Sequence, residues 1–287
     1  MSNTKHPMPT IKSLLAQAAD SLATISSSPT LDAEVLLCQV LGKARPYLRA
    51  WCDQAVSEAQ LQEFQRLWQQ RLQGRPIAYL TGQREFWSRD FLVTPDVLIP
   101  RPDTELLIEL SLKLIPPGAE WNIIDLGTGS GIIAITIAAE RPNTRLTAVD
   151  RSLEALQVAR QNAGRHHIQN IQFHQSDWFR QVPAQRFQLV ISNPPYIAEH
   201  DWHLQHGDVR FEPQSALIAG DQGLSDIKAI AETAKNWLVA GGWLLIEHGY
   251  DQETAVQAIF TASGYQQVQT ERDLSGQPRV TCGQLQT

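Results

Sequence analysis

The stretch Asn-Ile-Ile-Asp-Leu-Gly-Thr-Gly-Ser-Gly-Ile-Ile-Ala-Ile, residues 122–135, joins an apolar strand to an apolar helix through a glycine-rich loop. Glycine lets the backbone turn tightly and approach a ligand closely, and the first N–H groups of a helix have no partner within it. This combination predicts a pocket for a nucleotide-like ligand. The residues expected to surround that ligand are Gly127, Thr128, Gly129, Ser130 and Gly131.

The spacing of these glycines favours a nucleoside over a dinucleotide. A dinucleotide fingerprint, G-x-G-x-x-G, would need Gly or Ala at position 132, where this chain has Ile132. The next predicted strand ends on Asp150, whose carboxylate could accept hydrogen bonds from both hydroxyls of a ribose. The alternative is that Asp150 only caps the helix that follows it. Taken together, the loop and the acidic strand end predict an adenosine-containing ligand.

From Pro102 onward, helical and strand patterns alternate along the chain. Such alternation implies right-handed crossovers and a mostly parallel sheet with helices on both faces. We therefore predict an α/β fold: a doubly wound, Rossmann-like sheet of seven strands whose last two form an antiparallel hairpin. The expected strands are residues 121–125, 145–150, 171–176, 187–191, 242–247, 265–271 and 279–285.

The N-terminal part of the chain has a different pattern, with apolar residues at helical spacing up to Gly74. Ser57-Glu58-Ala59-Gln60 has the form of a capping box. Between residues 75 and 100 the pattern alternates as in a β-hairpin. We predict an N-terminal helical substrate-recognition domain over 1–74, a β-hairpin linker over 75–100 and the α/β domain over 101–287.

Composition excludes several classes of function. The 287 residues carry a net charge of −6 without a run of Lys or Arg, which disfavours a stable nucleic-acid partner. The three cysteines are too scattered for a disulfide framework or a zinc site and indicate a reduced, cytoplasmic protein. The longest apolar run is too short to span a bilayer, and the N-terminus lacks an apolar signal region, so no membrane role is expected. His200, His203 and His206 lack the further ligands of a metal site, so no metal is predicted.

The order of an acidic strand end, three glycines and Asp150 resembles the S-adenosylmethionine-dependent methyltransferases. The resemblance implies S-adenosylmethionine as the cofactor. It also places Asp177 and Trp178, just after the third strand, where the adenine is held, with Trp178 as a wall of the pocket.

A second motif, Asn193-Pro194-Pro195-Tyr196, follows the predicted strand 187–191. Consecutive prolines hold φ near −65° and leave a stiff turn with free carbonyl groups, although an ordinary strand exit can look the same. Within the resemblance, this motif is typical of methyltransferases that act on a planar nitrogen conjugated to a π-system. The Asn193 side-chain oxygen and the Pro194 carbonyl are then expected to accept its two N–H bonds, while Tyr196 stacks on the flat group. Those acceptors would stabilise the positive charge that develops on the nitrogen.

This interpretation assigns catalytic roles to Asn193, Pro194 and Tyr196. It adds Pro195 to the substrate-binding set and Asn193 to the cofactor-binding set.

Further motifs make nearly the whole chain resemble the PrmC/HemK family of release factor glutamine methyltransferases. That resemblance implies methyl transfer to the side-chain amide of the glutamine in the Gly-Gly-Gln loop of bacterial class 1 release factors, during translation termination. The motifs are Leu98-Ile99-Pro100-Arg101-Pro102-Asp103-Thr104-Glu105, Asp221-Gln222-Gly223-Leu224, Asp32-Ala33-Glu34 and Pro76-Ile77-Ala78-Tyr79-Leu80-Thr81-Gly82.

Two alternatives remain open at this point. An adenine-specific nucleic-acid methyltransferase would share the pocket and the Asn-Pro-Pro-Tyr motif, but would be expected to carry a basic groove. A ribosomal-protein glutamine methyltransferase would share both motifs but lack the Pro-Asp-Thr-Glu run that follows Arg101. Arg101 itself is expected either to pair with the methionine carboxylate of the cofactor or to anchor the hairpin to the α/β domain.

Overall fold

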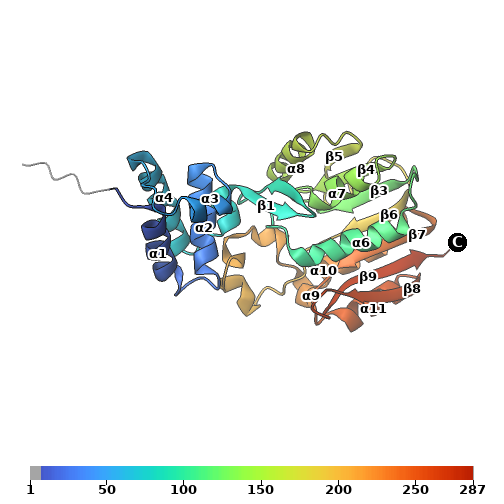
Figure 1. Ribbon diagram of the computed structural model, residues 1–287. Coiled ribbons are helices and arrows are strands. Elements are labelled where there is room, and N and C mark those ends of the chain that lie inside the picture. Colours follow the sequence, from blue (N-terminus) through green and yellow to red (C-terminus); the bar gives the residue numbers. More distant parts are fainter. Residues whose placement is uncertain (1–7, 287) are drawn as a thin grey trace, which may run out of the picture. The chain divides into compact units, whose positions relative to one another are not determined.

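The computed structural model describes residues 8–286, and the chain forms two compact units (Figure 1). The helical unit comprises the chain up to Gly82 together with Gln205–Phe211. The α/β unit comprises Gln83–Leu204 and Glu212–Thr287. Residues 75–82 and 205–211, which the sequence patterns did not assign to the helical domain, therefore belong to the helical unit.

The helical unit is built on short amphipathic helices whose apolar faces meet in one core. Leu14, Leu36 and Phe64, from three different helices, are all buried in it. The predicted capping box is present, because Ser57 Oγ accepts from the backbone N–H of Gln60 and the Ser57 N–H donates to Gln60 Oε1. The helices are α1 (Ile11–Leu22), α2 (Pro29–Leu41), α3 (Arg45–Ala50), α4 (Glu58–Leu72) and α5 (Ile77–Thr81).

The predicted hairpin opens the α/β unit. Strand β1 (Gln83–Phe86) pairs antiparallel with β2 (Arg89–Leu92). The two residues between them, Trp87 and Ser88, have φ of 52° and 55°. Two successive positive φ angles are those of a tight hairpin turn whose twist matches the strands.

The α/β unit contains the predicted seven-stranded sheet, which confirms the fold class. Its strand order is β5-β4-β3-β6-β7-β9-β8. The five strands from β5 to β7 run parallel, whereas β9 pairs antiparallel with both β7 and β8. The strands are β3 (Asn122–Leu126), β4 (Arg145–Asp150), β5 (Ile171–Gln175), β6 (Phe187–Ser192), β7 (Leu238–Glu247), β8 (Tyr265–Arg272) and β9 (Pro278–Leu285).

Helices cover both faces of this sheet, so its central strands are apolar on both sides (Figure 1). On β3, Ile123 lies in the core formed with α6 and α7, while its neighbour Ile124 lies in the core formed with α10 and α11. The helices are α6 (Glu105–Leu114), α7 (Ile132–Glu140), α8 (Leu153–Arg165), α10 (Ser225–Ala234) and α11 (Glu253–Ala262). The shorter helical turns are η1 (Pro102–Thr104), η2 (Trp202–Gln205), η3 (Val209–Phe211), η4 (Gln214–Ala216) and α9 (Gly220–Gly223).

The strand order creates a crevice at the carboxyl ends of β3 and β6. The chain proceeds from β3 to β4 on one side and from β6 to β7 on the other, so the two connections diverge. Ligands of open α/β sheets bind at such a point. Leu126 and Ser192 are partners in register at the ends of these strands, and Ser192 Oγ donates to the Leu126 carbonyl at 2.8 Å. The two motifs found in the sequence begin directly after this pair.

Candidate active site

A cavity of about 970 Å³, its open mouth included, lies at this crevice and is lined entirely by the α/β unit. Most of the predicted cofactor-binding residues line it. These are Gly127, Thr128, Gly129, Ser130, Asp150, Asp177, Trp178 and Asn193. Pro195 of the Asn-Pro-Pro-Tyr motif also lines the cavity, together with Arg101, Thr104 and Asp226.

Backbone hydrogen bonds hold the glycine loop against β4. The N–H groups of Gly127 and Thr128 both donate to the Val149 carbonyl at 2.9 Å. Gly127 and Gly129 have φ of 72° and 54°, which glycine adopts without strain. A Cβ built at Gly129 would meet no atom within 4 Å. Because Gly129 faces open space at the cavity wall, the loop fits a ligand that approaches its backbone closely.

Gly131 takes part in the packing of two helices. It does not line the cavity, although the sequence placed it among the cofactor-binding glycines. Its φ is 85°, and a Cβ there would lie 2.9 Å from Ile135 Cδ1 and 3.1 Å from Ala159 Cβ. Gly131 therefore allows the start of α7 to pack closely against α8.

Asp150 is tied to the glycine loop. Its Oδ2 accepts from the Gly129 N–H and its Oδ1 from the Ser152 N–H, both at 2.9 Å. The N-cap of α8 is Ser152, whose side chain accepts from the Ala155 N–H. The alternative in which Asp150 merely caps that helix is therefore wrong. Burial raises the pKa of Asp150 above its ordinary value, against the hydrogen bonds that lower it.

Asp125 is a further buried acid that the predicted site did not include. It lies at the end of β3, and the Thr128 hydroxyl donates to its Oδ2 at 2.6 Å. Burial raises the pKa of Asp125 to about 7. The sequence signal for it was present, because Asp125 is the acidic residue that begins the glycine motif.

Trp178 lies next to the glycine loop and lines the cavity. Its ring would be 3.4 Å from a Cβ at Gly127. The backbone at Trp178 has a φ of 49°, and Ser176 Oγ donates to its carbonyl at 2.6 Å. Asp177 also lines the cavity, but its carboxylate is paired with Arg180 at 2.8 Å. Contact of these two residues with an adenine stays a prediction.

The Asn-Pro-Pro-Tyr motif is divided between the cavity and the interior. Asn193 and Pro195 line the cavity, whereas Pro194 and Tyr196 do not. The Asn193 Nδ2 donates to Thr104 Oγ1 at 3.2 Å. The Tyr196 hydroxyl donates to Glu247 Oε1 at 3.3 Å, so its polar end is turned toward the end of β7. The predicted stacking of Tyr196 on the methyl acceptor stays a prediction.

A tight packing contact holds the motif in place. Gly223, in the Asp221-Gln222-Gly223-Leu224 stretch, has a φ of 87°, and a Cβ there would lie 2.1 Å from the Tyr196 carbonyl oxygen. The Gln252 Nε2 donates to the same carbonyl at 3.0 Å. Only glycine at position 223 allows this approach.

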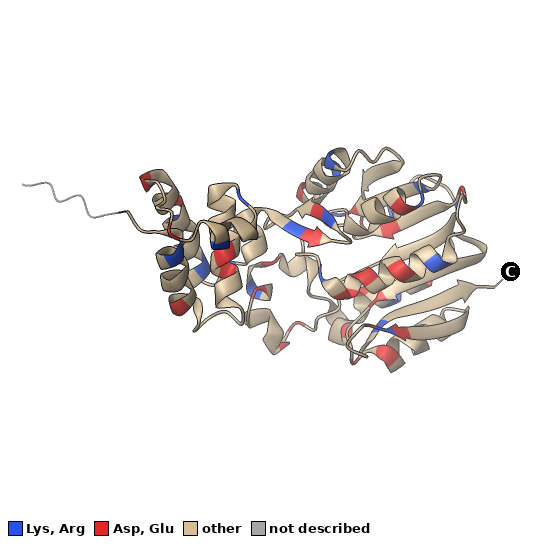
Figure 2. Cartoon of the chain, in the orientation of Figure 1, with Lys and Arg blue, Asp and Glu red and all other residues tan. Residues whose placement is uncertain are grey.

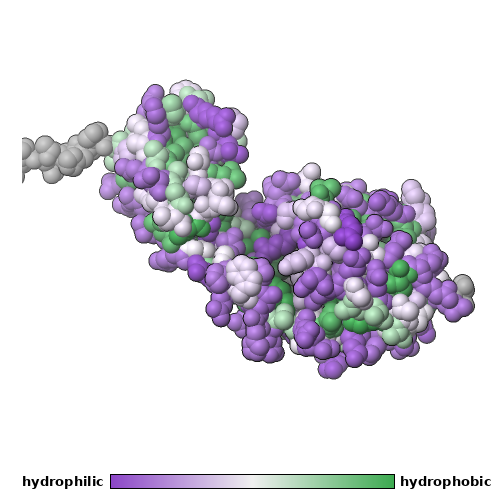
Figure 3. Space-filling view, turned by 90° about the horizontal axis from the view of Figure 1, so that it is seen from below, coloured by the Kyte–Doolittle hydropathy of each residue, from purple (hydrophilic) through white to green (hydrophobic). Residues whose placement is uncertain are grey.

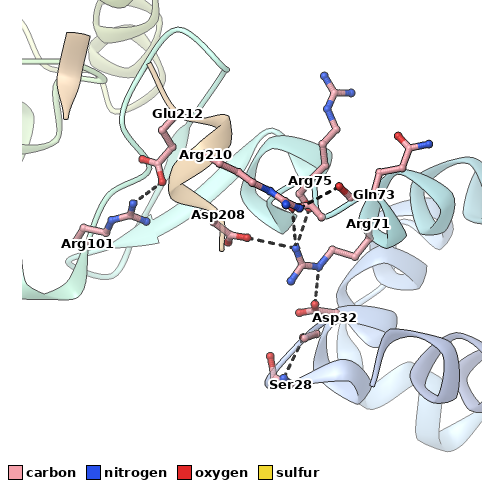
Figure 4. A network of polar contacts seen from close by, with 11 residues as sticks. Ser28, Asp32, Arg71, Gln73, Arg75, Arg101, Asp208, Arg210 and Glu212 are labelled. Carbon is pink, nitrogen blue, oxygen red and sulfur yellow. Dashed lines mark hydrogen bonds and ion pairs between the residues drawn. The ribbon is translucent and has the colours of Figure 1, made fainter. Parts of the chain in front are cut away.

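Arg101 lines the cavity and forms an ion pair with Glu212 (Figure 4). Glu212 also accepts a hydrogen bond from the Ile99 N–H at 3.0 Å, and its side chain is buried. The positive charge of Arg101 is therefore already balanced by an internal carboxylate. Pairing with the carboxylate of a cofactor stays a prediction.

Two buried partners of the Asn-Pro-Pro-Tyr motif were not predicted as site residues from the sequence, and one of them, Thr104, lines the cavity. Thr104 is the partner of Asn193, and Glu247 is the partner of Tyr196. Thr104 lies in the Pro-Asp-Thr-Glu run, and Glu247 ends a parallel strand. The position of Glu247 could have placed it at the crevice, since the carboxyl ends of parallel strands meet at one edge of the sheet. Thr104 could have been found only through the motif that contains it.

Neither a metal site nor a membrane span is found within residues 8–286. No group of three or more His, Cys, Asp or Glu side chains there could hold a metal ion. No helix in the same range is both long and apolar enough to cross a membrane.

Comparison with known proteins agrees with this geometry. The model of the Methyltransferase small domain family matches residues 103–211, and that of the PrmC N-terminal domain matches residues 13–82. A crystal structure of a methyltransferase from Pyrococcus furiosus has the same fold, with a TM-score of 0.54 over 76% of this chain and 98% of that one, at 18% identity. The fold and the pocket define an S-adenosylmethionine-dependent methyltransferase, which confirms the predicted enzyme class and cofactor.

Full-length relatives identify the family. The release factor glutamine methyltransferase of Vibrio cholerae is 48% identical over 97% of this chain and 98% of its own length. The protein of the same name from Escherichia coli K12 is 48% identical over 90% of this chain and 93% of its own. The chain belongs to the family of release factor glutamine methyltransferases.

Proposed function

We propose that this protein transfers a methyl group from S-adenosylmethionine to the side-chain amide nitrogen of the glutamine in the Gly-Gly-Gln loop of class 1 peptide chain release factors. The observation that carries the proposal is the place of Asn193, which lines the same cavity as the glycine loop and Asp150. Since release factors act in translation, we place the protein in the cytoplasm.

The residues of the cavity fit the cofactor by their chemistry. Gly127, Gly129 and Ser130 would border it, and the Asp150 carboxylate would accept from ribose hydroxyls. When bound, S-adenosylmethionine supplies a methyl group on a positively charged sulfur.

In this reaction Asn193 and Pro194 would bind the amide nitrogen that receives the methyl group. An amide nitrogen is a poor nucleophile because its lone pair is delocalised. Accepting its two N–H bonds on Asn193 Oδ1 and the Pro194 carbonyl would orient it and stabilise the positive charge that develops on it. As the bond from nitrogen to the methyl group forms and the methyl–sulfur bond breaks, the nitrogen would lose one N–H proton, which would leave to water. Alignment can contribute about 7–11 kcal/mol to such a reaction without a general base acting before attack.

The distribution of charge argues against a nucleic acid as the methyl acceptor. Figure 2 shows Lys and Arg interspersed with Asp and Glu along both units, and the net charge is −6. A methyltransferase that grips a nucleic-acid backbone relies on many clustered cationic contacts. The charge pattern therefore favours a protein acceptor. The Pro-Asp-Thr-Glu run after Arg101 favours a release factor over a ribosomal protein.

A direct assay separates these substrates. We expect mass spectrometry to show one added methyl on the Gly-Gly-Gln glutamine after incubation of the protein with a release factor and S-adenosylmethionine. A release factor with glutamate at that position has no –NH₂ group and should stay unmodified. Methylation of an adenine-containing oligonucleotide without methylation of the release factor would overturn the proposal.

Replacing Asn193 should remove catalysis and keep the cofactor. We expect Asn193→Ala to lower kcat by roughly 10²–10³, about 2.7–4 kcal/mol, by analogy with the loss of one oxyanion-hole hydrogen bond. Cofactor affinity, measured by calorimetry, should be largely retained because the glycine loop and Asp150 are intact. Asn143→Ala, at an exposed asparagine outside the cavity, is the matched control and should keep wild-type kcat. An unchanged kcat in Asn193→Ala would remove Asn193 from the reaction.

A further inference from the structure

Asn162 is a fully buried residue of α8 whose side chain bonds to the backbone of two other segments. Its Oδ1 accepts from the Leu92 N–H at 2.7 Å. Its Nδ2 donates to the Leu92 carbonyl at 3.0 Å and to the Ser130 carbonyl at 2.8 Å. Because a backbone N–H donates and a carbonyl accepts, these three bonds fix the orientation of the amide. Asn162 therefore ties the end of β2 to the glycine loop.

Ser130 is held from α8, whereas the earlier part of the glycine loop is held from β4. Backbone N–H groups of residues 127–129 donate to Val149 and Asp150 at the end of β4. Ser130 comes after them and lines the cavity, and its carbonyl accepts from Asn162. The position of this wall of the cavity therefore depends on α8 as well as on β4.

Leu92 precedes a second wall of the cavity. The chain turns soon after it, where the Val97 N–H donates to the Thr94 carbonyl at 3.1 Å and the Asp96 N–H donates to Thr94 Oγ1 at 3.2 Å. From this turn onward, residues 96–98, 100 and 101 line the cavity. Since Asn162 bonds to both polar backbone groups of Leu92, the turn and the wall that follows it begin from a fixed point.

Other side chains also hold the hairpin of β1 and β2, but on helices alone. Glu105 of α6 accepts from the Trp87 N–H at 3.0 Å. Glu140 of α7 pairs with Arg89 at 2.9 Å. These bonds do not involve the glycine loop. Asn162 differs from them because it bonds to the hairpin and to the loop at once.

We propose that Asn162 is a positioning residue for S-adenosylmethionine, because it fixes the glycine loop and the wall after β2 relative to each other. Its own side chain does not line the cavity, so it acts through Ser130 and Leu92. If the docked hairpin raises the affinity for the cofactor, the bound cofactor must favour the docked hairpin by the same factor. The inference rests on the cofactor of the proposed function and not on its methyl acceptor.

The first test measures the Kd of S-adenosylmethionine by calorimetry. Asn162→Ala should raise this Kd roughly two- to tenfold, the effect of losing one hydrogen bond that holds the loop. Asn170→Ala is the matched control, because Asn170 Nδ2 also donates to a backbone carbonyl, that of Thr144 at 3.0 Å, outside the cavity. The control should keep the wild-type Kd. An unchanged Kd in Asn162→Ala would overturn the proposal.

The second test measures hydrogen exchange in the wild-type protein, which reports local opening of the backbone. S-adenosylmethionine should slow exchange in residues 83–92 by roughly the same two- to tenfold, although this hairpin does not line the cavity. The hairpin of β8 and β9, residues 265–285, also lies outside the cavity and serves as the internal control. It should respond less. An equal response in the two hairpins would contradict the proposal.

Variants show whether this response passes through Asn162. In Asn162→Ala, at equal saturation with S-adenosylmethionine, the slowing in residues 83–92 should be lost. Arg89→Ala removes a hairpin contact that does not involve the glycine loop, so it should keep the cofactor affinity and the response. Persistence of the response in Asn162→Ala would sink the inference. If that variant does not fold, the comparison of the two wild-type hairpins decides. A wild-type protein that binds no S-adenosylmethionine would refute the proposed function itself, and the inference with it.

Discussion

Asp150 links the glycine loop to the cofactor pocket, because its carboxylate accepts from the Gly129 N–H while it lines the cavity. Replacing it with Ala removes a charged hydrogen-bond acceptor. We expect Asp150→Ala to weaken S-adenosylmethionine binding by about 1.5–3 kcal/mol, or about ten- to a hundredfold in Kd. Calorimetry on the wild type and the variant measures this directly.

Glu120→Ala is the control for that change, since Glu120 is exposed and does not line the cavity. Its cofactor affinity should equal that of the wild type. Because burial raises the pKa of Asp150, wild-type affinity should also decline as pH falls, beginning above the pH at which an exposed Asp protonates. An unchanged Kd in Asp150→Ala would exclude Asp150 from the pocket.

Helix α4 ends in a buried arginine that joins separate segments of the helical unit. Arg71 donates to Asp32 Oδ2 on α2 at 2.8 Å and to the Arg75 carbonyl at 3.0 Å, and it pairs with Asp208 at 3.3 Å (Figure 4). Removing one partner of a buried pair costs about 3–5 kcal/mol, because the other charge is left uncompensated. Arg71→Ala should therefore destabilise this unit strongly, as measured by denaturant unfolding and by hydrogen exchange in α2 and α4.

The same helix provides the matched control. Arg66 pairs with Glu63 at 2.6 Å, but both side chains are about half exposed. Exposed pairs contribute about 0–1 kcal/mol, so Arg66→Ala should change stability little. Equal effects of the two substitutions would show that burial of the Arg71 network does not stabilise the unit.

In our proposal the α/β unit binds the cofactor and the helical unit recognises the substrate. The cofactor cavity is lined only by the α/β unit. The helical unit adds a surface of its own, on which hydrophobic residues lie among polar ones (Figure 3), and Ile25, Leu31 and Trp51 are exposed there. We expect a truncated protein that begins at Gln83 to bind S-adenosylmethionine with wild-type affinity and to methylate a release factor poorly.

The truncated protein needs its own control, because Gln205–Phe211 would lose the residues it packs with in the helical unit. Calorimetry with S-adenosylmethionine serves this purpose, since wild-type affinity shows that the cavity is intact. Full methylation by such a protein would show that the helical unit does not recognise the substrate.

The sequence by itself determined the fold class, the cofactor and the family. The fold class follows from local patterns: a strand, a glycine loop and a helix must lie together because they are contiguous, and an acidic strand end can be located by its spacing. The cofactor and the family follow from the resemblance of these motifs to those of known methyltransferases. The capping box at Ser57 and the hairpin of β1 and β2 were predictable for the same reason. Most of the predicted cofactor residues accordingly line one cavity.

Only the tertiary structure decided which side chains of each motif face that cavity. Gly131 packs on Ala159, a residue of the next helix, so no local rule could separate it from Gly127 and Gly129. The partners Thr104 and Glu247 stand 89 and 51 residues from Asn193 and Tyr196 in the chain. The pKa values of Glu247 and Asp125 are raised only in the folded protein, because burial disfavours the charged form of each carboxyl group. Burial and long-range contacts are properties of the packed molecule, whereas sequence patterns report only on neighbours along the chain.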